Sequence, residues 1–228
     1  MIETMTMLGV PAMYWGFVLV ALTAFLLGSI PTSFLIGTWF YGIDPREYGS
    51  GASGATNTAR SLGAKAAIFT GVFDIFKGWS AVMIAKWFIV PQAMFDESAM
   101  LWAMGLAMIA VALGHAYSPW LGFRGGKSAS VVGGATLAFN PIFALLCIAF
   151  MIVAAYLIRY MSVVTMAVAA FLPIGMALLP PSRGHIQLVS ATAVSAVFVI
   201  WLHRENIKRL LAGEENKISF GSGKGDSA

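Results

Sequence analysis

The chain has 228 residues, of which 59% are hydrophobic and 11% are charged. Its mean hydropathy of +0.81 excludes an ordinary soluble domain and predicts an integral membrane protein. The formal net charge of +4 is modest, and the single cysteine, Cys147, excludes an internal disulfide and a cysteine-based metal site.

Seven apolar stretches predict an all-α polytopic membrane protein, because a helix needs about 20 residues to cross the hydrocarbon core. In chain order the predicted spans are residues 13–41, 66–90, 99–117, 128–139, 141–160, 162–179 and 185–202. The first is too long for a straight crossing, and Pro31 inside it predicts a kink. The fourth has 12 residues and is expected to be short, tilted or partly re-entrant. Residues 1–220 are expected to form a single integral membrane domain, followed by a disordered tail over residues 221–228.

The distribution of basic residues predicts the orientation, because Lys and Arg stay on the cytoplasmic side when loops are short. With seven spans, one side of the membrane receives only Arg183 as a basic residue. The other side collects eleven: Arg46, Arg60, Lys65, Arg124, Lys127, Arg159, Arg204, Lys208, Arg209, Lys217 and Lys224. The N-terminus is therefore predicted outside and the C-terminus in the cytoplasm.

Three ionisable side chains in the second and third predicted spans bear on the function. Asp74 and Lys77 lie three residues apart in the second span, and because a lone charge in hydrocarbon is costly, they are expected to pair with each other or to face the site. Structural pairing is the favoured role. His115, at the end of the third span, has two interpretations: a hydrogen-bonded helix end or a ligand-binding group.

Three glycine-rich or polar segments all fall on the predicted cytoplasmic side, at residues 48–60, 114–130 and 203–215. Gly49, Gly51 and Gly54 of the first have the spacing of a dinucleotide-binding loop, but the βαβ context of such a loop is missing. What remains is a flexible backbone that can approach a ligand closely.

The second segment predicts an anion site. Its sequence GFRGGKSAS ends like a Walker loop in Gly126-Lys127-Ser128, but Leu121 stands where the first glycine belongs, and no strand precedes it. Closely spaced glycines still let backbone N–H groups point at one anion, while Lys127 supplies a charge. In the third segment, His203 and Asn206 share a helix face, although the segment also reads as a basic stop-transfer anchor.

The chemistry of these segments points away from covalent catalysis. The sequence has no G-x-S-x-G nucleophile elbow, no H-E-x-x-H metal motif and few acids in the predicted cytoplasmic loops. The site is expected to hold no metal and to act on a phosphate-bearing molecule that meets a hydrophobic chain.

The three segments closely resemble the signature motifs of the acyl-phosphate:glycerol-3-phosphate acyltransferases, the PlsY family of bacterial phospholipid synthesis. GSGASGATNTAR resembles the family pattern GSGNVGATNxxR, and HRENIKRLLAGEE resembles HRENIxRLxxGxE. GHAYSPWLGFRGGKSAS resembles the pattern that runs from GHxYP to FKGGKG. The resemblance extends from about residue 25 to residue 215.

The resemblance implies transfer of a fatty acyl group from acyl phosphate to the 1-hydroxyl of sn-glycerol 3-phosphate. The product would be lysophosphatidic acid, formed at the cytoplasmic face of the bacterial inner membrane without a covalent enzyme intermediate. No cofactor, metal or nucleic acid is implied, and a soluble enzyme that makes acyl phosphate is the implied functional partner. Because an acyl phosphate is already activated, such an enzyme needs position and charge rather than a nucleophile.

The motif positions imply roles for individual residues. Expected catalytic residues are Ser50, Arg60, Lys127 and His203. Expected substrate-binding residues are Gly49, Gly51, Gly54, Thr56, Asn57, His115, Arg124, Gly125, Gly126, Ser128 and Asn206. Lys127 and the amides near it would hold the phosphate of the donor, while the first and third segments would hold glycerol 3-phosphate. The proton of the attacking hydroxyl would pass to the substrate's own phosphate or to His203.

Several positions depart from the family pattern, and they leave alternatives open. Ala52 and Ser53 replace Asn-Val, Arg124 replaces the usual Lys, and Ser128 replaces a glycine beside the expected phosphate. The hydroxyl of Ser128 would either donate to that phosphate or crowd it. A divergent paralogue with another acyl donor or acceptor, a transporter of an anionic solute and a scaffold for other lipid enzymes are the alternative functions.

Overall fold

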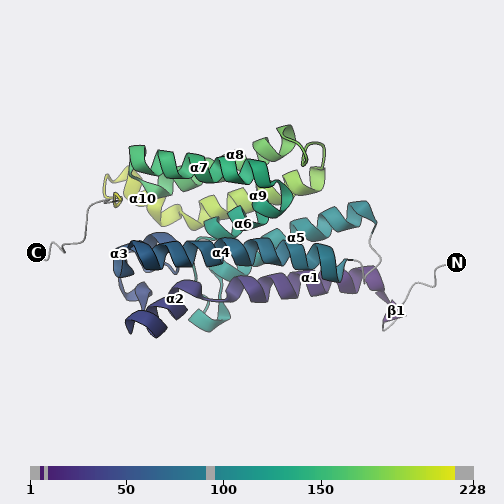
Figure 1. Cartoon of the computed structure of the whole chain (residues 1–228), viewed down its shortest axis with the longest axis horizontal. Coiled ribbons are helices and arrows are strands. Elements are labelled where there is room, and N and C mark those ends of the chain that lie inside the picture. The colour runs from purple at the N-terminus through teal and green to yellow at the C-terminus, as the bar shows by residue number, and fades with distance from the viewer. Residues whose placement is uncertain (1–5, 8–9, 91–95, 219–228) are drawn as a thin grey trace, which may run out of the picture.

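The computed structural model describes residues 6–7, 10–90 and 96–218, and these form a bundle of helices with one short antiparallel hairpin (Figure 1). The hairpin pairs β1 (Thr6–Met7) with β2 (Val10–Pro11). The long helices are α1 (Ala12–Ser29), α4 (Ala64–Ile84), α5 (Glu97–Ala116), α7 (Pro141–Ile158), α8 (Met161–Leu178) and α9 (Ile186–Leu202). The shorter ones are α2 (Thr32–Ile36), α3 (Ala55–Leu62), α6 (Ala129–Phe139) and α10 (Arg204–Leu211). Single turns of other helix types are η1 (Gly37–Tyr41), η2 (Pro45–Glu47), η3 (Ala85–Ile89) and η4 (Pro119–Leu121).

The helices confirm a polytopic helical membrane protein. Within the described residues, 5 helical segments are long and apolar enough to cross a membrane, or 6 if α9 and α10, bent by 53° at His203, count as one. The fourth predicted span is α6, whose 11 residues leave it below this length. A total of seven spans therefore stays a prediction, as does disorder after residue 220, which lies outside the described residues.

The first span breaks where the sequence predicts a kink. Helix α1 ends at Ser29 and α2 begins at Thr32, on either side of Pro31. A break frees backbone carbonyls that hydrocarbon cannot hydrate, so other parts of the chain must donate to them. The hydroxyl of Ser118 donates to the carbonyl of Ser29 at 2.6 Å, and Nζ of Lys77 donates to the carbonyl of Ile30 at 2.9 Å.

Small residues let the central helices pack closely. A Cβ on Gly28 of α1 would collide with the carbonyl of Val111 in α5. In the same way, a Cβ on Gly134 of α6 would collide with the carbonyl of Ile75 in α4. Close approach through small residues is the usual packing of helices in lipid, where the hydrophobic effect does not drive helices together.

Helix α6 covers only part of the membrane depth. Its 11 residues span about 16 Å, roughly half of the hydrocarbon core. Its C-terminal end lies near the loop between α8 and α9. Asn140, the residue after α6, donates to the carbonyl of Pro180 in that loop at 3.1 Å. At its other end, Ser128 bonds to Ala112, a full turn inside α5. The loop before α6 therefore enters the bundle, which fits a partly re-entrant segment.

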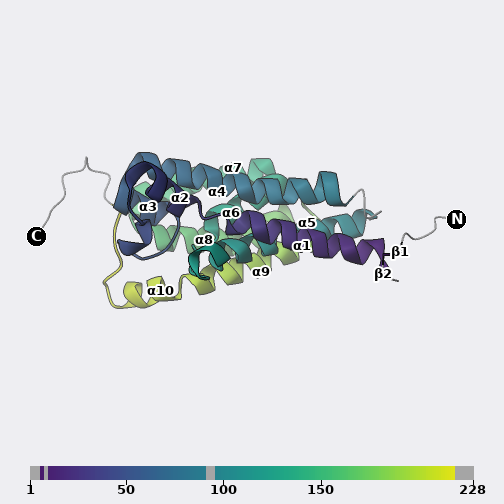
Figure 2. The ribbon, with the colours of Figure 1, turned by 90° about the horizontal axis from the view of Figure 1, so that it is seen from below.

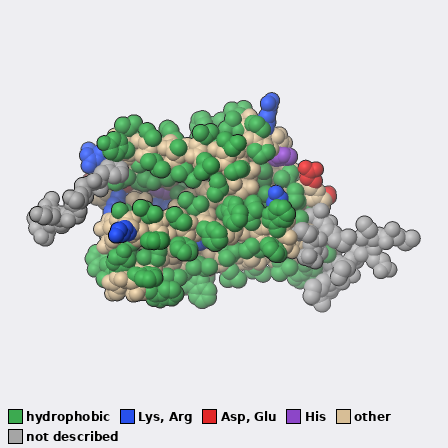
Figure 3. Space-filling model, viewed as in Figure 1, with side chains coloured by type: hydrophobic (Ala, Val, Ile, Leu, Met, Phe, Trp, Pro, Cys, Tyr) green, Lys and Arg blue, Asp and Glu red, His purple; other side chains and the backbone are tan. Residues whose placement is uncertain are grey.

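The surface has the polarity of a membrane protein. Hydrophobic side chains cover most of the side of the bundle in Figure 3, and charged side chains lie toward its two ends. Helices α3 and α10 lie at the same end, opposite the start of α1, in both views (Figures 1 and 2). The three motif segments identified in the sequence belong to the end that carries α3 and α10.

Candidate active site

The three motif segments meet at one end of the bundle, where hydrogen bonds join the second segment to the first and to the third, and the first to the residue after the third. The N–H of Ser53, in the first segment, donates to the carbonyl of Gly125 in the second at 3.3 Å. Lys127 of the second segment donates to the side-chain oxygen of Asn206 in the third. Arg60, in α3, donates to the carbonyl of Asn216, just after the third segment, at 3.4 Å. Residues more than a hundred positions apart in the sequence thus form one site.

The first segment is a loop that Asn57 holds in shape. Oδ1 of Asn57 accepts hydrogen bonds from the backbone N–H of Ser50 at 2.8 Å and from its hydroxyl at 3.3 Å. The amide of Asn57 donates to the carbonyl of Pro45 at 2.8 Å. Gly49 has φ +61°, and a Cβ there would collide with Oδ1 of Asn57, so this position requires glycine. Asn57 is 2% exposed, so its side chain supports the loop from inside. Ser50, to which it bonds, lies at the surface of the loop.

The second segment rests on the end of α5. The N–H groups of Gly125 and Gly126 donate to the carbonyls of Ala116 and His115 at 2.9 and 3.0 Å. A Cβ on Gly126 would collide with Nε2 of His115, so the imidazole lies directly against this glycine. His115 is therefore a buried helix-end residue that shapes the glycine loop, and two of the loop's amides are already engaged.

The hydroxyl of Ser128 is engaged within the protein. It donates to the carbonyl of Ala112 at 2.7 Å, and the residue is 1% exposed. Its φ of 61° lies in the left-handed region that favours glycine, the residue of the family pattern. The side chain is thus used in packing the loop against α5.

Lys127 is the residue whose surroundings favour an anion. Burial lowers its pKa to about 8, and the charges of Arg209 and Arg60 act in the same direction. Its hydrogen-bond partner, the side chain of Asn206, is neutral. Among the described residues Lys127 has no carboxylate within ion-pair distance. A partly desolvated cation with cationic neighbours is stabilised by a bound anion.

The third segment brings His203 and Asn206 inward, as the shared helix face predicts. His203 is 4% exposed, and its Nδ1 lies 2.8 Å from the carbonyl of Val199. Because a carbonyl only accepts, Nδ1 carries a proton, and in the neutral form of the ring Nε2 has the lone pair.

Within the part of the chain that the structure describes, four of the expected residues make no hydrogen bond to another motif segment. Arg124 has an exposed side chain on the loop before Gly125, and Thr56 is half-buried in α3. Gly51 has φ +69°, and a Cβ on Gly54 would meet open space. Conformation thus requires a glycine at position 51, and packing does not require one at position 54.

The sequence interpretation missed the acid at the centre of the site. Glu215 accepts hydrogen bonds from Asn206 at 2.6 Å, Ser162 at 2.8 Å and Arg209 at 2.8 Å. Burial would raise its pKa, but these three hydrogen bonds outweigh burial and lower it. Its position in the family pattern RLxxGxE was the available signal, while Ser162 has no motif to mark it.

Comparison with known proteins assigns the family. A family model described as glycerol-3-phosphate acyltransferase matches residues 18–213. The chain belongs to the glycerol-3-phosphate acyltransferase family. A glycerol-3-phosphate acyltransferase of Burkholderia cenocepacia is 38% identical over 200 residues, which cover 88% of this chain and 90% of that relative. One of Clostridioides difficile is 38% identical over 204 residues, covering 90% of this chain and 96% of that relative.

Solved structures of the acyltransferase family share this fold. The crystal structure of PlsY (YgiH), an integral membrane glycerol 3-phosphate acyltransferase, in its glycerol 3-phosphate form has a TM-score of 0.76 and 29% identity. The alignment covers 89% of this chain and 96% of that chain. The lysophosphatidic acid form of the same protein has a TM-score of 0.74 and 28% identity, with 89% and 95% covered. These comparisons confirm the family that the motifs predict. They also decide against the transporter alternative.

Proposed function

We propose that this acyltransferase moves a fatty acyl group from acyl phosphate to the 1-hydroxyl of sn-glycerol 3-phosphate. The observation that carries the proposal is Lys127, a partly buried cation at the point where the three motif segments meet, with no carboxylate in ion-pair distance among the described residues. Because Glu215 is engaged by Asn206, Ser162 and Arg209, two phosphate-bearing substrates would supply the negative charge that Lys127 needs. The relatives' names and the two PlsY forms, with glycerol 3-phosphate and with lysophosphatidic acid, support the acceptor and the product.

In this proposal, the hydroxyl oxygen of glycerol 3-phosphate attacks the carbonyl carbon of acyl phosphate. The bond from that carbon to the phosphate oxygen breaks, and inorganic phosphate leaves with the bonding electrons. Lys127 neutralises the donor phosphate, and Arg60 with the loop around Ser50 holds the acceptor. The proton of the hydroxyl passes to the substrate's own phosphate or to Nε2 of His203, whose Nδ1 lies 2.8 Å from the carbonyl of Val199. Position and charge then supply the catalysis.

The acyl chain requires an apolar groove beside the phosphate. One groove between α6, α7 and α8 begins at Ala129, the residue after Ser128, and includes Cys147. A wider groove of about 740 Å³ lies between α2, η1 and α4 and includes Phe69. The first groove has a volume of only about 50 Å³, so the proposal places in it the part of the chain next to the phosphate loop, where this groove starts.

Variants in the two grooves test this placement. Cys147→Trp should shift the enzyme toward shorter acyl chains, because the indole fills the groove, while Cys147→Ala should leave chain preference unchanged. Rates with a series of acyl chain lengths give the measurement. If Phe69→Ala changes the preference and Cys147→Trp does not, the chain lies in the wider groove instead.

The membrane arrangement is part of the proposal. Seven segments over residues 1–220 would form a single acyltransferase domain of the bacterial inner membrane, with the N-terminus outside and the site facing the cytoplasm. The support is the predicted excess of basic residues at the end where the three motif segments meet. A separate, soluble enzyme would then supply the acyl phosphate.

The deciding experiment supplies the purified protein in lipid with labelled glycerol 3-phosphate and one of three donors: acyl phosphate, acyl-CoA or acyl carrier protein. Labelled lysophosphatidic acid is expected from acyl phosphate. Product from acyl-CoA alone would reject the donor and identify a divergent paralogue, and no product from any donor would reject the enzyme. Lys127→Ala should abolish turnover while the protein still inserts into the membrane.

A further inference from the structure

Two charged side chains inside the bundle lie outside the candidate site. Asp74 and Lys77 are one turn apart on α4, with side chains only 2% and 7% exposed. Nζ of Lys77 lies 2.9 Å from Oδ1 of Asp74, which confirms the pairing expected from their spacing. A buried ion pair is weak evidence for stability, because the cost of removing two charges from water offsets their attraction. The contacts around the pair indicate a more specific role.

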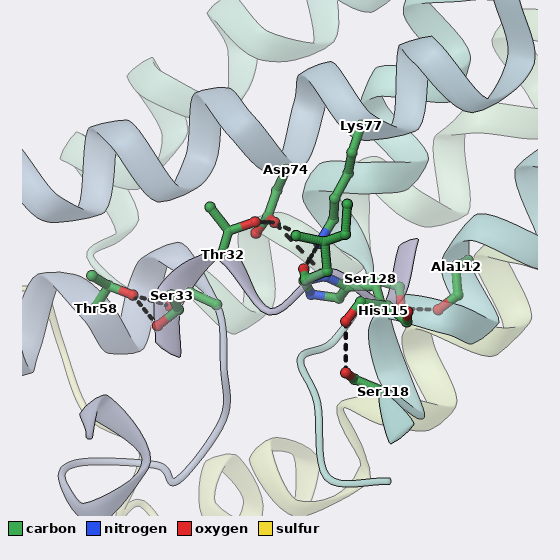
Figure 4. A network of polar contacts seen from close by, with 12 residues as sticks. Thr32, Ser33, Thr58, Asp74, Lys77, Ala112, His115, Ser118 and Ser128 are labelled. Atoms are coloured by element: carbon green, nitrogen blue, oxygen red, sulfur yellow. Dashed lines mark hydrogen bonds and ion pairs between the residues drawn. The ribbon is translucent and has the colours of Figure 1, made fainter. Parts of the chain in front are cut away.

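Two series of contacts, called arms below, start at this pair, and the first of them runs to the first motif segment. Asp74 accepts a hydrogen bond from the hydroxyl of Thr32 at 3.0 Å, at the start of α2. The next residue, Ser33, lies with its hydroxyl 2.8 Å from that of Thr58 in α3. Figure 4 shows this chain of contacts from α4 through the start of α2 to α3. Helix α3 carries Arg60, so the arm ends at the group proposed to hold glycerol 3-phosphate.

The other arm leads to the glycine loop. Nδ1 of His115 lies 3.8 Å from Oδ1 of Asp74. The backbone carbonyl of His115 accepts a hydrogen bond from the N–H of Gly126 at 3.0 Å. The imidazole also lies directly against Gly126, where a Cβ would collide with Nε2. Lys127 follows Gly126, so this arm ends at the proposed donor site.

Lys77 completes the arrangement at the break of the first span. It donates to the carbonyl of Ile30 at 2.9 Å, between the end of α1 and the start of α2. The same carbonyl accepts from the N–H of Thr32 at 3.0 Å, so Lys77 binds the segment from which the Thr32 side chain reaches Asp74 (Figure 4).

We propose that Asp74 and Lys77 are positioning residues for acyl transfer. From α4 they set the distance between two half-sites: the donor half-site at the glycine loop and the acceptor half-site at α3. One arm, through Thr32, orients α3 and the acceptor. The other, through His115, orients the glycine loop and the donor. The assignment of the half-sites rests on the proposed function.

The first test neutralises both partners at once, so that no charge is left unpaired. Asp74→Asn/Lys77→Gln should remain folded and inserted, while kcat/KM falls about 10- to 100-fold, the effect of a small misplacement of reacting groups. The assay uses whichever donor the unmodified enzyme accepts, so failure of the donor assignment is seen separately. Lys86→Gln, which removes an amine further along the same helical segment, is the matched control and should leave the kinetics unchanged.

The second test separates the arms. Thr32→Val has nearly the same shape and keeps both charges, but it removes the hydrogen bond to Asp74. It should raise KM for glycerol 3-phosphate about three- to tenfold, the equivalent of one hydrogen bond, with KM for the donor unchanged. Thr32→Ser, which keeps the hydroxyl, should restore the original value.

These outcomes decide the proposal. A folded Asp74→Asn/Lys77→Gln protein with unchanged kinetics would overturn it and leave the pair a purely structural role. If that protein does not fold, Thr32→Val decides: equal changes in both KM values, no change, or no recovery in Thr32→Ser would each overturn the positioning role.

Discussion

Lys127 shows how a single residue acquires a function from its surroundings. A lysine in water keeps its proton to a pH above about 10, but burial and the cationic side chains of Arg209 and Arg60 lower the pKa of this one to about 8. Its amide partner, Asn206, cannot neutralise it, and the nearby Glu215 is occupied by Arg209, Ser162 and Asn206 itself. A phosphate is the group that would complete the charge balance.

The pH dependence of donor binding follows from this pKa. Lys127 is charged below about pH 8 and loses its proton as the pH rises through that value. KM for the donor should therefore rise above pH 8, by at most about tenfold per pH unit. Lys127→Arg should give a flat profile over the same range, because a guanidinium keeps its proton. KM measured across the range checks this, and parallel profiles for the two proteins would contradict it.

Ser128 is a second residue whose role depends on conformation. Its left-handed backbone costs about 1–2 kcal/mol, and its hydrogen bond to Ala112 returns about 1 kcal/mol. Ser128→Ala should therefore lower stability by about 1 kcal/mol, while Ser128→Gly should stay within about 1 kcal/mol of the parent. Both proteins should keep their activity, because the hydroxyl faces α5. Thermal unfolding and turnover in lipid are the measurements, and a folded but inactive Ser128→Ala would place the hydroxyl on a substrate.

At the scale of elements, the short helix α6 depends on its contact with α4. Gly134 faces the carbonyl of Ile75 across this contact, while the neighbouring Gly133 has open space around its Cα. The same contact sets the depth at which α6 begins, and the loop that carries Lys127 ends there. Helix packing and the geometry of the site are therefore coupled.

A pair of glycine variants tests that coupling. Gly134→Ala should cost about 1–3 kcal/mol of stability and reduce turnover, because the added methyl separates α6 from α4. Gly133→Ala adds the same methyl to the same helix without a collision, so stability should not fall and should rise by at most about 1 kcal/mol. Because Gly133 lines the groove proposed for the acyl chain, turnover of the two proteins is compared with a short-chain donor. Thermal unfolding midpoints and rates of the two proteins give the comparison. Equal effects at the two positions would show that helix propensity, not the contact, is responsible.

For the whole molecule, the placement of charge defines the ends of the bundle. The three motif segments and most basic residues belong to the end with α3 and α10, whereas Arg183 lies in the turn between α8 and α9 at the other end. This asymmetry predicts which end faces the cytoplasm.

Labelling of single cysteines tests the orientation. In a Cys147→Ala background, Arg183→Cys should react with a membrane-impermeant thiol reagent in intact cells. Lys208→Cys, in the exposed face of α10, should react only after the membrane is opened. The reverse pattern would invert the proposed topology, and labelling of both positions in intact cells would exclude a C-terminus in the cytoplasm.

The sequence alone determined the class of the protein, the helices and the segments that form the site. Hydropathy and charge are local properties, so they marked the membrane segments, the break at Pro31 and the pairing of Asp74 with Lys77. The quoted motifs were sufficient to predict the family, which the comparisons confirm. The roles of single site residues stay predictions.

Only the tertiary structure decided how these parts fit together. The hydroxyl of Ser128 bonds to Ala112 because the loop before α6 packs against α5. Glu215 bonds to Asn206 and Arg209 because the chain folds back on α10 after Leu211. The short α6 begins inside the bundle because Gly134 brings it against α4, a fact that length alone left open. Distances between helices depend on packing of the whole bundle, and no local pattern in the sequence contains them.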